Sequence, residues 1–127
     1  MRVLLTGFEA FPGAPYNPTP ALIKSLAKLR RPALADVAIA THVFPVTYAA
    51  VDRELPQLLA REKPDVVLMF GLAARTPHVR VETRARNAIT TLWPDAGGRK
   101  AVKSAVIVPD GPAALQFGPF TAELFRR

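Results

Sequence analysis

The chain of 127 residues contains no cysteine and only two histidines, His42 and His78. Without a thiol, these residues cannot perform thiolate catalysis or build a cysteine-ligated metal centre. The histidines occur in neither an HxxxH nor an HExxH spacing, so we predict no metal site and no cofactor. The absence of cysteine, and therefore of disulfides, fits a reducing compartment, and we expect a cytoplasmic protein.

Long apolar runs are also missing, although half of the residues are hydrophobic. No run approaches the roughly 18 apolar residues of a membrane-spanning helix. The first residues do not resemble a signal peptide, so we expect no membrane partner. The size suits one hydrophobic core, and we predict a single domain over residues 1–127.

Acidic residues are few, with 10 Asp and Glu against 17 Lys and Arg, and the net charge is +7. Such a charge favours a negatively charged partner, of which nucleic acid is the first candidate. However, the basic residues are scattered along the chain, and no aromatic residues interleave with them. We therefore favour a solvated, arginine-rich surface and rank nucleic acid last among the partners.

The alternation of apolar segments predicts an α/β fold. Three segments are typical of strands and two of amphipathic helices: residues 2–6, 36–44 and 66–71, then 19–29 and 48–60. The strand at 66–71 has the clearest pattern of a buried strand. Thr19 is expected to be an N-cap with Pro20 at the first helical position, and Pro56 to kink its helix or mark a first turn. This order is typical of a three-layer α/β/α arrangement with an open, mostly parallel sheet.

The second half of the chain is less regular. We expect extended segments over residues 79–90 and 103–109 and turns at 95–98 and 110–112. Within residues 117–127 we expect a helix that starts near Pro119.

Ligands of open α/β sheets bind beyond the carboxyl ends of the strands. Two loops lie there, at residues 7–17 and 71–77. The first contains Phe8 and Phe11, which suit a flat, mostly apolar ligand. The alternative is that both rings fold back onto the sheet and pack in the core.

Few residues indicate catalysis directly. Glu82 lies among arginines and could orient a histidine or a substrate amide, or could simply form an exposed ion pair with Arg80 or Arg84. His42 is expected to be structural and His78 to lie at the surface.

The stretch VLLTGFEAFPGAPYNP resembles the opening of the pyroglutamyl peptidase I family, where a strand runs into a TGF-x-PF-G-x-x-x-x-NP loop. The matching residues are Thr6, Gly7, Phe8, Phe11, Gly13, Asn17 and Pro18. A second family signature, G-Q-A-G-G-R followed by E-R-V-A-I-N, aligns with GLAARTPHVRVETRARN, where Gly71, Ala73, Glu82, Ala85 and Asn87 agree. Pro94-Asp95 and the segment Asp110-Gly111-Pro112-Ala113 resemble two further family segments.

The resemblance implies a cysteine peptidase that removes an N-terminal pyroglutamyl residue from a small peptide. It implies that Phe8 and Phe11 line the pocket for the lactam ring and that Leu72 stands at a substrate-binding position. Asn17 matches a residue that helps to hold the shape of the site. Glu82 matches the acid of the family's Cys-His-Glu triad.

Departures from the family pattern limit this expectation. Leu72 replaces a glutamine, Ala74-Arg75-Thr76 replaces Gly-Gly-Arg, and Leu92 replaces an arginine. The family's cysteine and histidine fall after the residues present, so we expect an N-terminal portion of the fold, apparently truncated at its C-terminus and inactive alone. The alternative is a non-catalytic member that binds a ligand or partner. An incomplete fold would expose apolar faces, which favours a homo-oligomer.

Overall fold

The computed structural model describes residues 1–89, 94–100 and 105–118. They divide into two compact units, each described here by itself: Met1–Ala74 with Asp95–Gly97, and the described residues among 75–94 and 98–127. The single domain over residues 1–127 stays a prediction.

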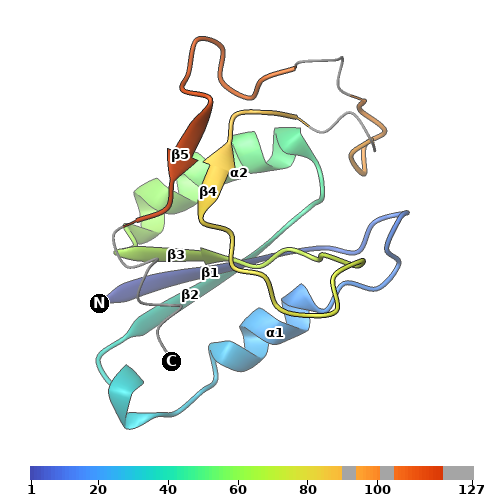
Figure 1. Cartoon of the computed structure of the whole chain (residues 1–127). Coiled ribbons are helices and arrows are strands. Elements are labelled where there is room, and N and C mark those ends of the chain that lie inside the picture. The colour runs from blue at the N-terminus through green and yellow to red at the C-terminus, as the bar shows by residue number, and fades with distance from the viewer. Residues whose placement is uncertain (90–93, 101–104, 119–127) are drawn as a thin grey trace. The chain divides into compact units, whose positions relative to one another are not determined.

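The first unit contains a three-stranded parallel sheet (Figure 1). The strands are β1 (Arg2–Phe8), β2 (Ala38–Phe44) and β3 (Val66–Met69), in the order β2-β1-β3. The register places Val3 of β1 opposite Ile39 of β2 and Val66 of β3. The predicted mostly parallel α/β sheet is therefore confirmed.

Two helices cover opposite faces of this sheet, α1 (Thr19–Leu26) and α2 (Tyr48–Glu62) (Figure 1). Successive side chains of a strand point to opposite faces, so β1 contributes to two cores. One core contains the buried residues Val3, Leu5 and Ile23; the other contains Leu4, Phe44 and Leu58. This arrangement has the three layers that the sequence predicts.

The ends of the helices differ in part from the expectation. Pro18, not Thr19, is the N-cap of α1, and Pro20 is the second helical residue. The helix ends at Leu26, three residues earlier than predicted, and the chain continues in tight turns in which Leu29 donates to the Leu26 carbonyl at 3.1 Å. The hydroxyl of Thr19 is unavailable for capping because it is hydrogen-bonded to the end of β1.

Helix α2 has well-defined caps at both ends. The side chain of Thr47 accepts a hydrogen bond from the Ala50 amide at 3.2 Å, and Lys63 ends the helix with a left-handed φ of 43°. Pro56 lies inside the helix, which continues to Glu62, so the proline does not mark a first turn. A proline inside a helix removes one backbone hydrogen bond.

Strand β3 corrects the sequence interpretation. We expected a buried strand at residues 66–71, yet Leu68 and Met69 are 43% and 47% exposed. Among the described residues, β3 is paired only with β1. The apolar pattern is that of a strand covered on both faces, but no described layer covers its carboxyl-terminal half.

The second unit contains a two-stranded antiparallel sheet of β4 (Arg84–Arg86) and β5 (Ala114–Gln116). The extended segment expected over 79–90 is a strand only in β4, and β5 was not anticipated, because a three-residue strand carries almost no periodic signal.

Other expectations for the second half have mixed outcomes. A turn is present at Asp110, which has a φ of 58°, and a turn at residues 96–97 precedes Gly98. Residues 105–109 are not a strand, which contradicts that part of the predictions. Positions 90–93, 103–104 and 119–127 lie outside the described residues. Over the part of the chain that is described, no helix is both long and apolar enough to cross a membrane.

Candidate functional site

The loop that follows β1 is held by two side chains at the start of α1. The hydroxyl of Thr19 accepts a hydrogen bond from the Phe8 amide at 2.9 Å and donates to the Phe8 carbonyl at 3.2 Å. The Asn17 side chain donates to the Glu9 carbonyl at 3.2 Å and accepts from the Thr19 amide at 3.0 Å. Both side chains are buried. They therefore fix the backbone where it leaves the sheet.

Gly7 is required by this close approach. A Cβ added at Gly7 would lie 2.9 Å from the Thr19 Oγ1 atom and 3.1 Å from the Thr19 backbone carbon. Any larger residue would push α1 away from the end of β1. The Thr-Gly-Phe sequence thus has a local structural reason.

The two loop phenylalanines have different surroundings. The ring of Phe8 is 5.8 Å from that of Phe44 and packs against the core on the α2 side, so the core-packing alternative applies to it. Phe11 is half-buried in a turn closed by two backbone hydrogen bonds to Ala14, at 3.1 and 2.7 Å. A Cβ on Gly13 would lie 3.2 Å from the Phe11 ring, so the ring covers that glycine. Their assignment to substrate binding stays a prediction.

Leu72 lies in the loop after β3 and is half-buried. Strands β1 and β3 are parallel neighbours, and the amide of Phe70 donates to the Thr6 carbonyl at 2.8 Å. The loops after both strands therefore leave the sheet at the same edge. The structure brings the segments that contain Phe8, Phe11, Asn17 and Leu72 to one edge of the first unit.

Glu82 belongs to the second unit. Its carboxylate forms a salt bridge with the Arg80 Nε atom at 2.7 Å, and both side chains are more than half exposed. The ion pair with Arg80 that the sequence left open is therefore present. The role of Glu82 in orienting a histidine stays a prediction.

His42 contacts a carboxylate on the neighbouring helix. Its Nε2 atom is 2.9 Å from the Glu54 Oε2 atom, and its ring lies edge-on to Phe44 at 4.5 Å. The hydrogen bond from His42 lowers the pKa of Glu54, and a hydrogen bond from Arg53 lowers it further. These contacts join β2 to α2. His78 is exposed, and no group of three potential metal ligands occurs among the residues that the structure describes.

Sequence reasoning missed two side chains that organise loops. Thr19 was assigned to a helix cap, although its hydroxyl holds Phe8. Asn87 matched the family without a role, and its side chain donates to Val108 at 2.8 Å while accepting from the amides of Ile107 and Val108. Both are small polar residues beside a loop, a common but unspecific signal of side-chain to backbone hydrogen bonds.

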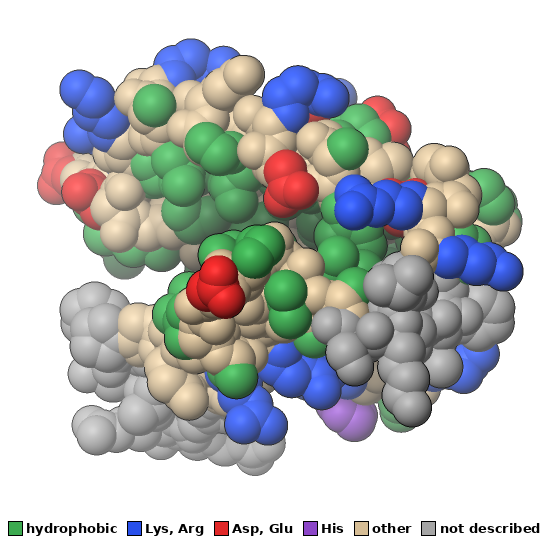
Figure 2. Space-filling model, turned by 90° about the horizontal axis from the view of Figure 1, so that it is seen from above, with side chains coloured by type: hydrophobic (Ala, Val, Ile, Leu, Met, Phe, Trp, Pro, Cys, Tyr) green, Lys and Arg blue, Asp and Glu red, His purple; other side chains and the backbone are tan. Residues whose placement is uncertain are grey.

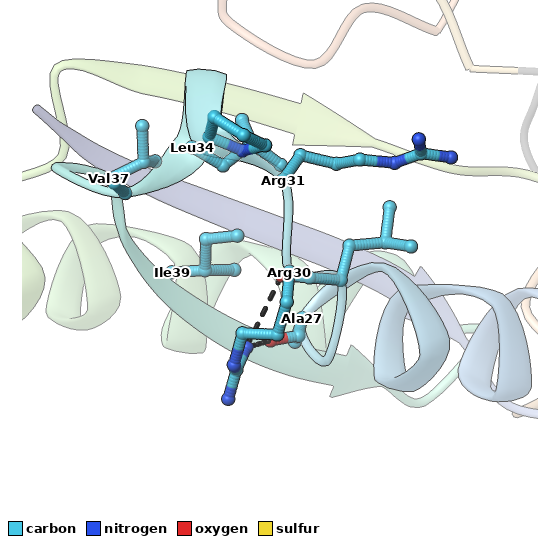
Figure 3. A pocket seen from close by; sticks show the side chains of 9 residues that line it. Ala27, Arg30, Arg31, Leu34, Val37 and Ile39 are labelled. Atoms are coloured by element: carbon cyan, nitrogen blue, oxygen red, sulfur yellow. Dashed lines mark hydrogen bonds between the residues drawn. The ribbon is translucent and has the colours of Figure 1, made fainter.

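A separate hollow of about 580 Å³ lies beyond the end of α1 (Figure 3). It is lined by Ala27, Leu29, Arg30, Arg31, Pro32, Leu34, Ala35, Val37 and Ile39. Val37 and Ile39 lie at the amino-terminal start of β2, so this hollow is at the edge opposite the loops of the predicted site. The Arg30 side chain turns toward the carbonyls of Ala27 and Leu29.

Comparison with known proteins identifies the family. The family model described as pyroglutamyl peptidase matches residues 1–119. The chain belongs to the pyroglutamyl peptidase family.

Individual members of the family are similar at about one third identity. The pyrrolidone-carboxylate peptidase of Pyrococcus furiosus is 35% identical over 114 residues, which are 90% of this chain and 53% of that protein. The protein of the same name from Thermococcus kodakarensis is 36% identical over 92% of this chain and 54% of its own length. The chain thus spans about half the length of these pyroglutamyl peptidase relatives.

Solved structures of pyroglutamyl peptidases agree with the fold. A mutant pyrrolidone carboxyl peptidase from Pyrococcus furiosus superposes with a TM-score of 0.81 at 34% identity, covering 91% of this chain and 54% of that one. Pyroglutamyl peptidase I of Bacillus amyloliquefaciens has a TM-score of 0.80 at 28% identity, covering 92% and 55%. The α/β/α arrangement is therefore that of about half of a pyroglutamyl peptidase.

Proposed function

We propose that this chain forms the substrate-pocket part of an enzyme that hydrolyses N-terminal pyroglutamyl residues from peptides. Membership of the pyroglutamyl peptidase family supports this activity. The position of the proposed pocket rests on the hydrogen bonds made by the side chains of Asn17 and Thr19. These bonds hold the loop that contains Phe8 and Phe11 at the carboxyl edge of a parallel sheet. An uncharged five-membered lactam suits aromatic surface beside backbone amides.

The proposed roles follow from chemistry and from the family pattern. Phe11 and Leu72 contact the lactam ring, Phe8 closes the pocket from the core side, and Asn17 keeps the loop in place. Glu82 orients a histidine, which serves as the general base toward a cysteine thiol. For that role, the Glu82 carboxylate must leave Arg80, and the exposure of both side chains makes such an exchange inexpensive.

Hydrolysis by this mechanism needs a thiolate, and none of the 127 residues is a cysteine. We therefore expect residues 1–127 alone to show no turnover. The nucleophile and its base would come from polypeptide outside these residues.

A chimera tests the proposal directly. Residues 1–119, the part that matches the family, are fused to the remaining half of the Pyrococcus furiosus relative, and release of a fluorophore from a pyroglutamyl amide is measured. We expect turnover by the chimera and none by residues 1–127. Glu82→Gln should lower kcat by about 10²- to 10⁴-fold, as expected for loss of the group that orients a catalytic base. Phe11→Ala should lower kcat/KM by about tenfold through lost pocket contact.

The matched control is Glu62→Gln on α2, whose carboxylate bonds to Arg61 on the same helix. It should leave both kinetic constants unchanged. Turnover by residues 1–127 alone would contradict the need for an external thiol, and a fully active Glu82→Gln chimera would contradict the role of Glu82.

A non-catalytic family member is the second candidate. It is favoured by Leu72, Arg75 and Leu92, which replace polar or small residues of the family pattern at positions where substrate contacts are expected. A folded chimera that binds a pyroglutamyl peptide in calorimetry but does not hydrolyse it would support this candidate.

A further inference from the structure

Strand β4 presents two arginines on one face. Arg84 and Arg86 are alternate residues of the strand, so their side chains project to the same side, and both residues are exposed. Strand β4 pairs with β5 (Figure 1). The register places Gln116 opposite Arg84 and Ala114 opposite Arg86. This face of the two-stranded sheet therefore carries two guanidinium groups and one amide, and its strand residues include no carboxylate.

Neither arginine has a charged partner in the part of the chain that the structure describes. Three other arginines are paired there with neighbouring carboxylates: Arg53 with Glu54, Arg61 with Glu62, and Arg80 with Glu82. Arg84 and Arg86 form no salt bridge or side-chain hydrogen bond with any described residue. Because the carboxylate of Glu82 is already bound to Arg80, no described carboxylate neutralises the charges of β4.

The surroundings reinforce the positive charge. The described residues of the second unit contain six Lys and Arg and only two acids, Glu82 and Asp110. The whole chain carries +7. On the face that Figure 2 shows, Lys and Arg side chains lie in several separate groups, which agrees with their scatter along the sequence. The β4 face differs because its two arginines share one short strand and lack partners.

The spacing suits a chain of phosphates. Alternate residues of a strand are about 7 Å apart, and each guanidinium can bind phosphate oxygens through two parallel N–H groups. A flexible single strand of nucleic acid carries one charge on every nucleotide and can align successive phosphates with two such groups. An acidic peptide would present carboxylates instead of phosphates, and the test below includes one.

We propose that the two-stranded β4–β5 sheet binds the phosphodiester backbone of single-stranded nucleic acid through Arg84 and Arg86. The strand residues of this face, Arg84, Arg86, Ala114 and Gln116, include no aromatic ring for base stacking. Binding therefore follows the backbone and does not depend on base sequence. This site is independent of the proposed peptidase function.

Fluorescence anisotropy with a labelled oligothymidylate tests the site. The intact chain is titrated at several salt concentrations between about 50 and 200 mM. The double variant Arg84→Gln, Arg86→Gln should bind about tenfold more weakly at the lowest salt. The slope of log K against log[salt] should become shallower by about 1.4, since each phosphate contact with a single strand contributes about 0.7.

The matched control removes the same charge elsewhere. Lys24→Gln with Lys28→Gln alters two exposed side chains on and beside α1, in the first unit, and should change affinity by less than about twofold while keeping the slope. Arg84→Lys with Arg86→Lys keeps the charge but loses the two parallel N–H donors of each guanidinium, and should give intermediate affinity. Circular dichroism establishes that each variant is folded.

Several results would overturn the inference. If the double variant of Arg84 and Arg86 to glutamine loses no more affinity than the control variant of Lys24 and Lys28 to glutamine, net charge alone attracts the oligonucleotide. Absence of binding at low salt would exclude the site. A strong preference for oligothymidylate over oligoadenylate would contradict backbone recognition, and tighter binding of polyglutamate through the same arginines would indicate an acidic protein partner instead.

Discussion

At the scale of single residues, Gly7 shows how closely β1 approaches the first turn of α1. We expect Gly7→Ala to lower the free energy of unfolding by about 1–3 kcal/mol, because the added methyl group meets both the side chain and the backbone of Thr19 in a packed region. Urea denaturation followed by circular dichroism measures the change.

Gly71 provides the control for this substitution. A Cβ at Gly71 would meet no atom within 4 Å, so Gly71→Ala should change stability by less than about 0.5 kcal/mol. If the two variants unfold at the same urea concentration, the Thr19 hydroxyl does not hold Phe8 as closely as the distances indicate.

At the scale of elements, the contact between His42 and Glu54 joins β2 to α2 and should make stability depend on pH. Hydrogen bonds from His42 and Arg53 hold the pKa of Glu54 below its ordinary value of 4.5. A carboxylate with a lowered pKa in the folded state stabilises the fold above that ordinary value, and the contribution disappears as the pH falls through the lower folded pKa. The contribution should therefore be complete at neutral pH and vanish in acid.

Unfolding of Glu54→Gln at a series of pH values checks this expectation. The variant should be less stable than the parent above pH 4.5, and the difference should shrink progressively below it. The control is Glu62→Gln, since the carboxylate of Glu62 bonds to Arg61 on its own helix. A stability difference that stays constant through the acid range would show that Glu54 acts by packing and not by charge.

At the scale of the whole molecule, β3 is the part of the sheet that is least covered. Leu4 of β1 is fully buried, whereas Leu68 of β3 is 43% exposed. We expect Leu4→Ala to cost about 2–5 kcal/mol and Leu68→Ala less than about 1 kcal/mol, because a half-exposed side chain loses little burial. Chemical denaturation of both variants at several protein concentrations measures these costs.

The outcome also indicates what covers the exposed part of β3. A large cost for Leu68→Ala that grows with protein concentration would mean that another copy covers β3, in line with the homo-oligomer that the sequence favours. A small cost at every concentration would leave β3 available to the polypeptide that makes up the other half of the pyroglutamyl peptidase relatives.

Local patterns predicted much of the first unit. Residues 38–44 and 48–62 have the periodicity of the elements they form, because apolar spacing reflects the geometry of a strand or a helix directly. The loop at residues 7–17 was singled out because Phe8 and Phe11 follow directly after a predicted strand. The sequence could not show whether Glu82 pairs with Arg80 or with Arg84, since both neighbours lie within reach of an exposed carboxylate. The structure shows the pair with Arg80.

The sequence by itself determined the order of the elements in the first unit, the family and the lack of a thiol among the 127 residues, since each depends only on which residues are present and how they are spaced. Tertiary structure alone decided that Thr19 clamps Phe8 and that β3 is half exposed. It also brought Arg84 and Gln116 together in one two-stranded sheet. The physical reason is distance along the chain: a hydrogen bond, a covering layer or a strand partner many residues away leaves no periodic trace in the local sequence.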